Sequence, residues 1–280
     1  MPHTTTINKT EILSKLHQLP MMPVVIQEVL ASFNTNNLNR TVLASKIERD
    51  QGLTAKVLRI ANSSFYGLPR SIHSISDAVI VMGFNSVRSL VISAGFMRAF
   101  PPTPGSLFDR KAHWHRSFRV AGYARALAKC LNQDQEIVFT AGMFHDIGQM
   151  VLDVCIPEQF ARILEQQKNT NANLLEIEQA ELGCDHSEIG AEMAERWNFP
   201  TEIERVIGDW RTPERAPFEP LNGLIFIAVL LESGLIEDAL MKKIPPGLIK
   251  NLALDWACIA STLPESGKLD EEARLLLSAA

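Results

Sequence analysis

The chain has 280 residues, 46% of them hydrophobic, so it can bury a substantial core as one large domain or as two lobes. Its 27 basic and 32 acidic residues give a net charge of -5, which disfavours non-specific binding to nucleic acid or to an anionic membrane. The chain starts without a secretory signal, and its longest apolar run, residues 224–231, is too short to cross a bilayer, so we expect a soluble cytoplasmic protein.

Apolar residues recur with helical spacing over nearly the whole chain, and alternating strand-like runs are scarce, so the sequence predicts an all-α fold. Five short helices are expected before residue 100. Pro20 and Pro23 precede the first of them, Gly52 separates the second from the third, and Gly83 separates the fourth from the fifth. We expect these helices to form an N-terminal helical lobe, residues 1–100.

The segment PPTPG, residues 101–105, is the clearest break in this pattern, because closely spaced prolines cannot continue a helix. We place a lobe boundary there and expect residues 106–280 to form a second helical lobe. Its first helices follow HWHRSFRVAGYARALAKCL, QEIVFTAGMFHDIGQMVLDVC and EQFARILEQQ, and Asp185 caps the next, which ends at Pro200. Further helices are expected at residues 202–210, 221–233, 236–242, 246–262 and 269–279.

Two polar residues, His145 and Asp146, stand in the otherwise mostly apolar or small run FTAGMFHDIGQM. On a continuous helix such neighbours point about 100° apart, which still lets an imidazole nitrogen and a carboxylate oxygen converge on one ion. His115 lies on the helix before this pair, on the same face as the small residues Gly122 and Ala126. His186 faces inward on the first turn of its helix, where the helix dipole should keep the ring neutral. These four residues either bind a metal or form a hydrogen-bonded network in the core.

The four cysteines, Cys130, Cys155, Cys184 and Cys258, lie far apart and form no CxxC pair, so neither a zinc ribbon nor a redox motif is supported. In a reducing cytosol we expect all four to be free thiols that pack as small apolar side chains.

Several segments, taken together in chain order, resemble the HDOD domain, the HD-related output domain of bacterial signalling: LPMMPVVIQEVL, IERDQGLTAKVLRIANSSFYG, HRSFRVAGYARALA, AGMFHDIGQMVL and DHSEIGAEMAERWNFP. The resemblance spans about residues 16–213. It implies a multi-helical HD-domain-like fold in a bacterial, cytoplasmic protein. The related HD superfamily contains metal-dependent phosphohydrolases, in which an earlier histidine, the HD pair and a later aspartate bind a divalent metal or iron.

By position, His115, His145 and Asp146 match the first three ligands of that superfamily's metal site. Val229 stands where the fourth ligand is expected and cannot bind a metal, so His186 together with Asp209 or Glu232 would have to complete the site. The resemblance therefore implies an incomplete HD site, with either no metal or an atypically bound divalent metal or iron. HDOD proteins commonly lose these residues and are thought to act as regulatory or interaction modules.

Three functions remain as alternatives. The first is a signal-transduction output module that binds a partner signalling protein or a small nucleotide-like ligand. The second is a metal-dependent phosphohydrolase or phosphodiesterase with an atypical HD site, so enzymatic activity stays open. The third is a helix-turn-helix DNA binder in residues 47–67, which the acidic net charge opposes. The oligomeric state also stays open, with a homodimer as one alternative.

Overall fold

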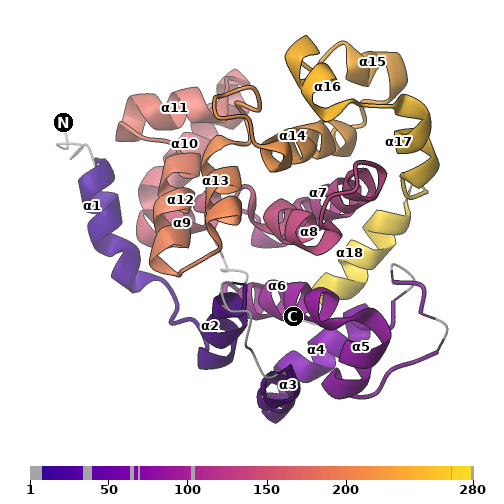
Figure 1. Cartoon of the computed structure of the whole chain (residues 1–280). Helices are drawn as coiled ribbons and strands as arrows, with labels where there is room; N and C mark the ends of the chain where they lie inside the picture. Colours follow the sequence, from indigo (N-terminus) through magenta and orange to yellow (C-terminus); the bar gives the residue numbers. More distant parts are fainter. Residues whose placement is uncertain are drawn as a thin grey trace.

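The computed structural model describes residues 8–33, 40–63, 66–68, 70–101, 105–265 and 267–278. Over these residues every regular element is a helix, which confirms the predicted all-α fold (Figure 1). None of the described helices is both long and apolar enough to cross a membrane. The proline-rich break predicted at 101–105 lies partly outside the described residues, and the division into two lobes stays a prediction.

The helices of the first hundred residues are α1 (Lys9–Ser14), η1 (Lys15–Gln18), α2 (Val24–Ala31), α3 (Arg40–Arg49), α4 (Gln51–Ala61), α5 (Ile75–Met82) and α6 (Phe84–Ala99). Those that follow, as far as the HD pair, are α7 (Arg110–Cys130) and α8 (Gln135–Phe144). The rest are α9 (Gly148–Cys155), α10 (Pro157–Thr170), α11 (Leu174–Leu182), α12 (His186–Arg196), α13 (Thr201–Asp209), α14 (Pro220–Glu232), α15 (Glu237–Met241), α16 (Pro246–Leu252), α17 (Trp256–Thr262) and α18 (Lys268–Ser278).

The buried apolar side chains of the described residues form one continuous hydrophobic core. Helix α6 is buried along almost its entire length, because it packs on α2, α4 and α5 below and on α8 above (Figure 1). The ring of Phe96, on α6, lies 4.6 Å from that of Phe144 at the end of α8. The C-terminal helix α18 contacts both α4, from the first hundred residues, and α7, from the residues that follow them.

Close backbone contacts at two glycines fix the helices around the HD pair. A Cβ atom on Gly148, the first residue of α9, would lie 1.7 Å from the carbonyl oxygen of His186 on α12. A Cβ atom on Gly142, on α8, would lie 2.6 Å from the Cα atom of Ala121 on α7. Only glycine permits approaches this close, so α9 touches α12 and α8 touches α7 backbone to backbone.

Side-chain caps explain where several helices begin. Asp185 accepts hydrogen bonds from the backbone N–H groups of Ser187 and Glu188, which confirms the predicted start of α12. Asp134 caps α8 in the same way.

Some helix boundaries differ from the prediction. Residues 135–155, expected as one helix, divide into α8 and α9, and residues 246–262 divide into α16 and α17, where Ala253 adopts φ 48°. Helices α1 and α11 were not predicted. The break between α8 and α9 comes from a tertiary contact that overrides the helical pattern, because Gly148 lies against the backbone of α12.

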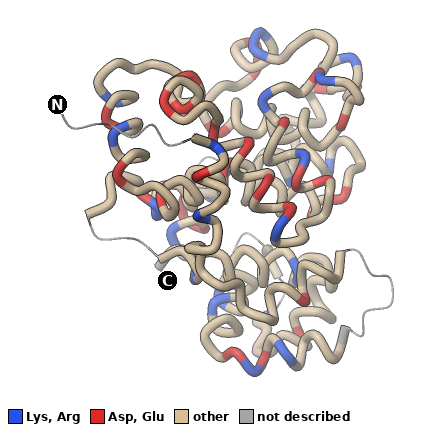
Figure 2. Tube along the Cα trace, turned by 90° about the vertical axis from the view of Figure 1, so that its left-hand side faces the viewer, with Lys and Arg blue, Asp and Glu red and all other residues tan. Residues whose placement is uncertain are grey.

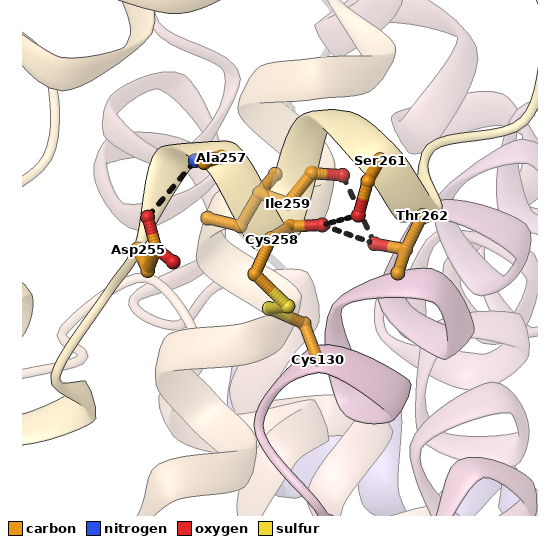
Figure 3. Close-up of a disulfide and its surroundings, with 7 residues drawn as sticks. All are labelled: Cys130, Asp255, Ala257, Cys258, Ile259, Ser261 and Thr262. Carbon is orange, nitrogen blue, oxygen red and sulfur yellow. Dashed lines mark hydrogen bonds between the residues drawn. A yellow bond between two sulfur atoms is a disulfide. The ribbon is translucent and has the colours of Figure 1, made fainter.

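The prediction of four free thiols is wrong for two of them. Cys130, at the end of α7, and Cys258, on α17, form a disulfide with sulfur atoms 2.12 Å apart (Figure 3). The fold brings them together because α17 packs on α7. Cys155 and Cys184 are buried free thiols, and burial raises the pKa of each to about 11.

Candidate functional site

The HD pair lies in a turn between two helices, not on a helix as the continuous pattern had predicted. His145 follows the last residue of α8, and α9 begins at Gly148. Both side chains are almost fully buried, with 0% of His145 and 2% of Asp146 exposed. The turn therefore places a carboxylate in the core, where it needs compensating partners.

Two arginines hold Asp146. Nη1 of Arg116, on α7, lies 2.9 Å from Oδ2, and Nη2 of Arg211, just after α13, lies 2.7 Å from Oδ1. The indole Nε1 of Trp210 donates to Oδ1 over 3.3 Å. Burial alone would raise the pKa of Asp146, but His145, Arg211 and His186 outweigh it and hold that pKa well below its usual range. Asp146 is therefore a carboxylate with both oxygens occupied.

His186 faces two carboxylates. Its Nδ1 donates to Oε2 of Glu178, on α11, over 2.7 Å, and its Nε2 lies 3.6 Å from Oδ1 of Asp146. Burial opposes a charge on the ring, but the neighbouring carboxylates of Asp146 and Glu178 outweigh it and raise the pKa of His186 to about 9. Nη2 of Arg211 also lies 2.9 Å from Nε2, and because a guanidinium group can only donate, Nε2 accepts this hydrogen bond. The two carboxylates favour a protonated ring, whereas the contact with Arg211 needs Nε2 as an acceptor and so favours a neutral one; the neutral ring expected from the helix dipole stays a prediction.

His145 behaves differently. Its Nδ1 is 2.8 Å from the carbonyl oxygen of Gly142, to which it donates, and its ring packs edge-on against Trp210 with 5.4 Å between ring centroids. Nε2 is buried and has no hydrogen-bond partner in the described part of the chain. Burial lowers the pKa of His145 to about 4, so the ring is neutral at pH 7.

The structure brings three of the four candidate residues together, and His115 is the exception. Its Nε2 lies 3.6 Å from Oδ1 of Asp270, on α18, and the side chain is partly exposed. Arg116, one residue further along α7, takes the position against Asp146. His113, which the sequence analysis did not select, is buried near the site, and burial lowers its pKa to about 3.

A series of ion pairs connects the site with α18. The Arg116 guanidinium reaches Oε2 of Glu232, on α14, over 3.2 Å, and Arg119 lies 3.8 Å from the other oxygen of Glu232. Arg119 also lies 3.2 Å from Asp270. Glu232, considered above as a replacement metal ligand, is therefore engaged by arginines. Asp209, the other candidate, pairs with Arg215 at the surface over 2.6 Å.

These residues do not fit a metal ion. Among the described residues no three histidine, cysteine, aspartate or glutamate side chains are grouped so that they could bind one. The guanidinium groups of Arg116 and Arg211 lie where a cation bound to Asp146 would have to sit, and they would repel it. Val229 supplies no ligand in exchange.

Sequence reasoning missed four residues of this site: Glu178, Arg116, Arg211 and Trp210. Glu178 lies on α11, and nothing in the segment LLEIEQAEL distinguishes this fully buried glutamate from the exposed ones around it. Trp210 is buried and donates into the site, although its charged neighbours suggest partial exposure. Its ring stacks with the Arg211 guanidinium at 4.1 Å, which helps to orient that side chain toward Asp146.

The model of the HDOD domain matches residues 19–213 of the chain. An uncharacterized protein from Treponema pallidum (strain Nichols) is 25% identical over 252 residues, which are 88% of this chain and 48% of that protein. The chain thus spans about half the length of that relative.

Two solved structures cover nearly the whole chain. The "Putative phosphohydrolase" from Shewanella amazonensis SB2B is 28% identical with a TM-score of 0.80, covering 95% of this chain and 98% of that one. A "Putative signal transduction protein" from Marinobacter aquaeolei VT8 has 22% identity and a TM-score of 0.76, covering 97% and 65%.

Proposed function

The chain belongs to the HDOD family, and we propose that it is a signal-transduction output module that works without a metal ion, by binding a partner signalling protein or a small nucleotide-like ligand. One observation carries this proposal: both carboxylate oxygens of Asp146 are held by guanidinium groups, those of Arg116 and Arg211. The charge that a metal ion supplies in an HD enzyme comes here from the chain itself.

The arrangement favours a binding role because it ties several helices to one buried charge. Arg116 comes from α7, Asp146 from the turn before α9, His186 from α12 and Arg211 from the end of α13. The Arg116 and Arg211 side chains are 40% and 24% exposed, so a ligand at the surface can reach both. Guanidinium groups bind phosphate and carboxylate groups in a bidentate manner, which suits a nucleotide-like ligand or an acidic segment of a partner.

A phosphohydrolase is the second candidate. It is supported by Nε2 of His145, which is buried without a hydrogen bond among the described residues and lies 3.5 Å from Oδ2 of Asp146, and by the 28% identical Shewanella structure named "Putative phosphohydrolase". Such an enzyme needs a metal ion to polarise phosphate and activate water, and Val229 and the two arginines oppose one. We therefore place this function second.

Metal analysis of protein purified without added ions distinguishes the two functions. We expect far less than one equivalent of iron, manganese or zinc, and no hydrolysis of bis-p-nitrophenyl phosphate when these ions are added. Stoichiometric metal that disappears in His145→Ala, together with hydrolysis, would overturn the proposal.

The variant Arg116→His sharpens the same experiment, because it removes one guanidinium from Asp146 and adds an imidazole. We expect it to bind a transition metal at least about tenfold more tightly than the unaltered chain. His115→Ala is the matched control on the same helix, since His115 does not contact Asp146, and it should leave metal binding unchanged.

A further inference from the structure

An apolar groove of about 810 Å³ is lined by none of the residues that surround Asp146. One wall consists of residues from η1, from the segment 19–22 and from α2, and the other is the end of α12 with the two residues that follow it. Helices α1 and α2 lie on the left-hand side of Figure 1, the side that is turned toward the viewer in Figure 2. Most of the groove's lining residues are apolar: Leu16, Leu19, Pro20, Met21, Met22, Val24, Ala31 and Trp197.

Two apolar side chains at this groove are exposed although their neighbours are buried. Met21 is 93% exposed and Val24 is 68% exposed, whereas Met22 and Ile26 are buried in the core. Exposed apolar side chains beside a hollow of this size contribute nothing to the stability of the single chain and are typical of an interaction surface. Methionine is also a side chain that adapts well to a partner surface.

We propose that a second copy of the chain covers this groove, in a two-fold symmetric dimer. A two-fold interface uses the same patch on both copies, so the patch must carry both the projecting and the receiving surface. This patch does, because Met21 and Val24 project beside the hollow that the same residues help to line. In the dimer, Met21 and Val24 of each copy enter the groove of the other.

The charges of the two walls complement each other across the same axis. Arg196 stands on the α12 wall, and no ion pair to it occurs within the described ranges. Glu28 stands on the α2 wall. A two-fold axis through the groove brings Arg196 of each copy to Glu28 of the other, so that the pair forms twice. Glu28 binds Lys46 within its own chain over 2.6 Å, an exposed pair that contributes little and does not prevent this contact.

The dimer does not depend on the proposed function, because no residue of the groove touches the Asp146 site. The two ideas therefore fail separately: metal content and hydrolysis test the site, and molar mass in solution tests the groove.

Sedimentation of the full chain over a range of concentrations tests the dimer. We expect the unaltered chain to sediment as a dimer, and the double variant Met21→Glu, Val24→Glu to weaken association at least about 100-fold. Ile80→Glu is the matched control: Ile80 is 80% exposed on α5 and lies outside the groove, so the variant should stay dimeric. A monomeric unaltered chain at the highest soluble concentration, or loss of the dimer in Ile80→Glu, would overturn the proposal.

A charge exchange tests the orientation of the two copies. Arg196→Glu should weaken association at least about tenfold, and adding Glu28→Arg should restore it, because the exchanged charges meet again across the axis. All these residues lie at the surface, and circular dichroism should confirm that each variant folds. A dimer that persists unchanged in Arg196→Glu would rule out this two-fold arrangement.

Discussion

Asp146 and Lys56 are two buried charged groups, and the protein treats them in opposite ways. Asp146 is surrounded by cations and donors, which keep it ionised in the core. Lys56, on α4, is also buried, but its Nζ has no hydrogen-bond partner among the described residues. Burial and the nearby charge of Arg98 lower the pKa of Lys56 to about 8. The charge of Asp146 is compensated by partners, whereas that of Lys56 is not and is therefore lost at a lower pH than usual.

This difference indicates which group holds the architecture together. A compensated buried charge connects the elements that supply its partners, and removing it leaves those partners uncompensated. An uncompensated buried charge connects nothing, so its removal should help folding. The predictions below test each half of this comparison.

Asp146→Asn should have the largest effect, because it leaves the guanidinium groups of Arg116 and Arg211 beside a neutral amide. We expect the free energy of unfolding to fall by about 3–5 kcal/mol, measured by urea denaturation at pH 7. The pKa of Asp146 is lower in the folded state than in the unfolded state, so its contribution is fully present at neutral pH. It is lost only as pH falls below 3.8 toward the folded value.

Asp209→Asn is the matched control for this variant. Asp209 pairs with Arg215 at the surface, and its loss should cost less than about 1 kcal/mol. Equal effects of the two substitutions would show that Asp146 does not hold the helices together.

Gly148→Ala should have the next largest effect, because the added methyl group would meet the carbonyl oxygen of His186 at 1.7 Å. Helices α9 and α12 would have to separate, which also pulls His186 from Asp146, at a cost of about 3 kcal/mol or more. Gly208→Ala is the matched control on α13, since its methyl group would lie 3.5 Å from Ala191. It should be neutral or stabilising by up to about 1 kcal/mol. Thermal unfolding of both variants checks the contrast.

The sequence predicted well those features that depend on local pattern, such as the Asp185 cap and the helical periodicity of α7 and α12. It selected His115 where Arg116 contacts Asp146, because one residue turns a helix by about 100° and the sequence does not show which of the two faces the HD pair. It also could not show that α8 ends at the HD pair, since that break depends on a contact between Gly148 and α12. The disulfide joins residues 128 positions apart, which no local pattern reveals.

Lys56→Met should have the smallest effect and the opposite sign. The folded pKa of about 8 lies below the ordinary value of 10.5, so below pH 8 both states carry the proton and the folded state bears the burial cost. At pH 7 the variant should therefore gain about 1–3 kcal/mol of unfolding free energy. Between pH 8 and 10.5 the unfolded state binds more protons, so the unaltered chain gains stability as pH rises and the difference shrinks. Urea denaturation of both proteins at pH 7 and pH 10 measures the difference in unfolding free energy and its decrease with pH. A variant that is less stable at pH 7 would mean that the buried amine has a compensating partner and that the contrast with Asp146 is false.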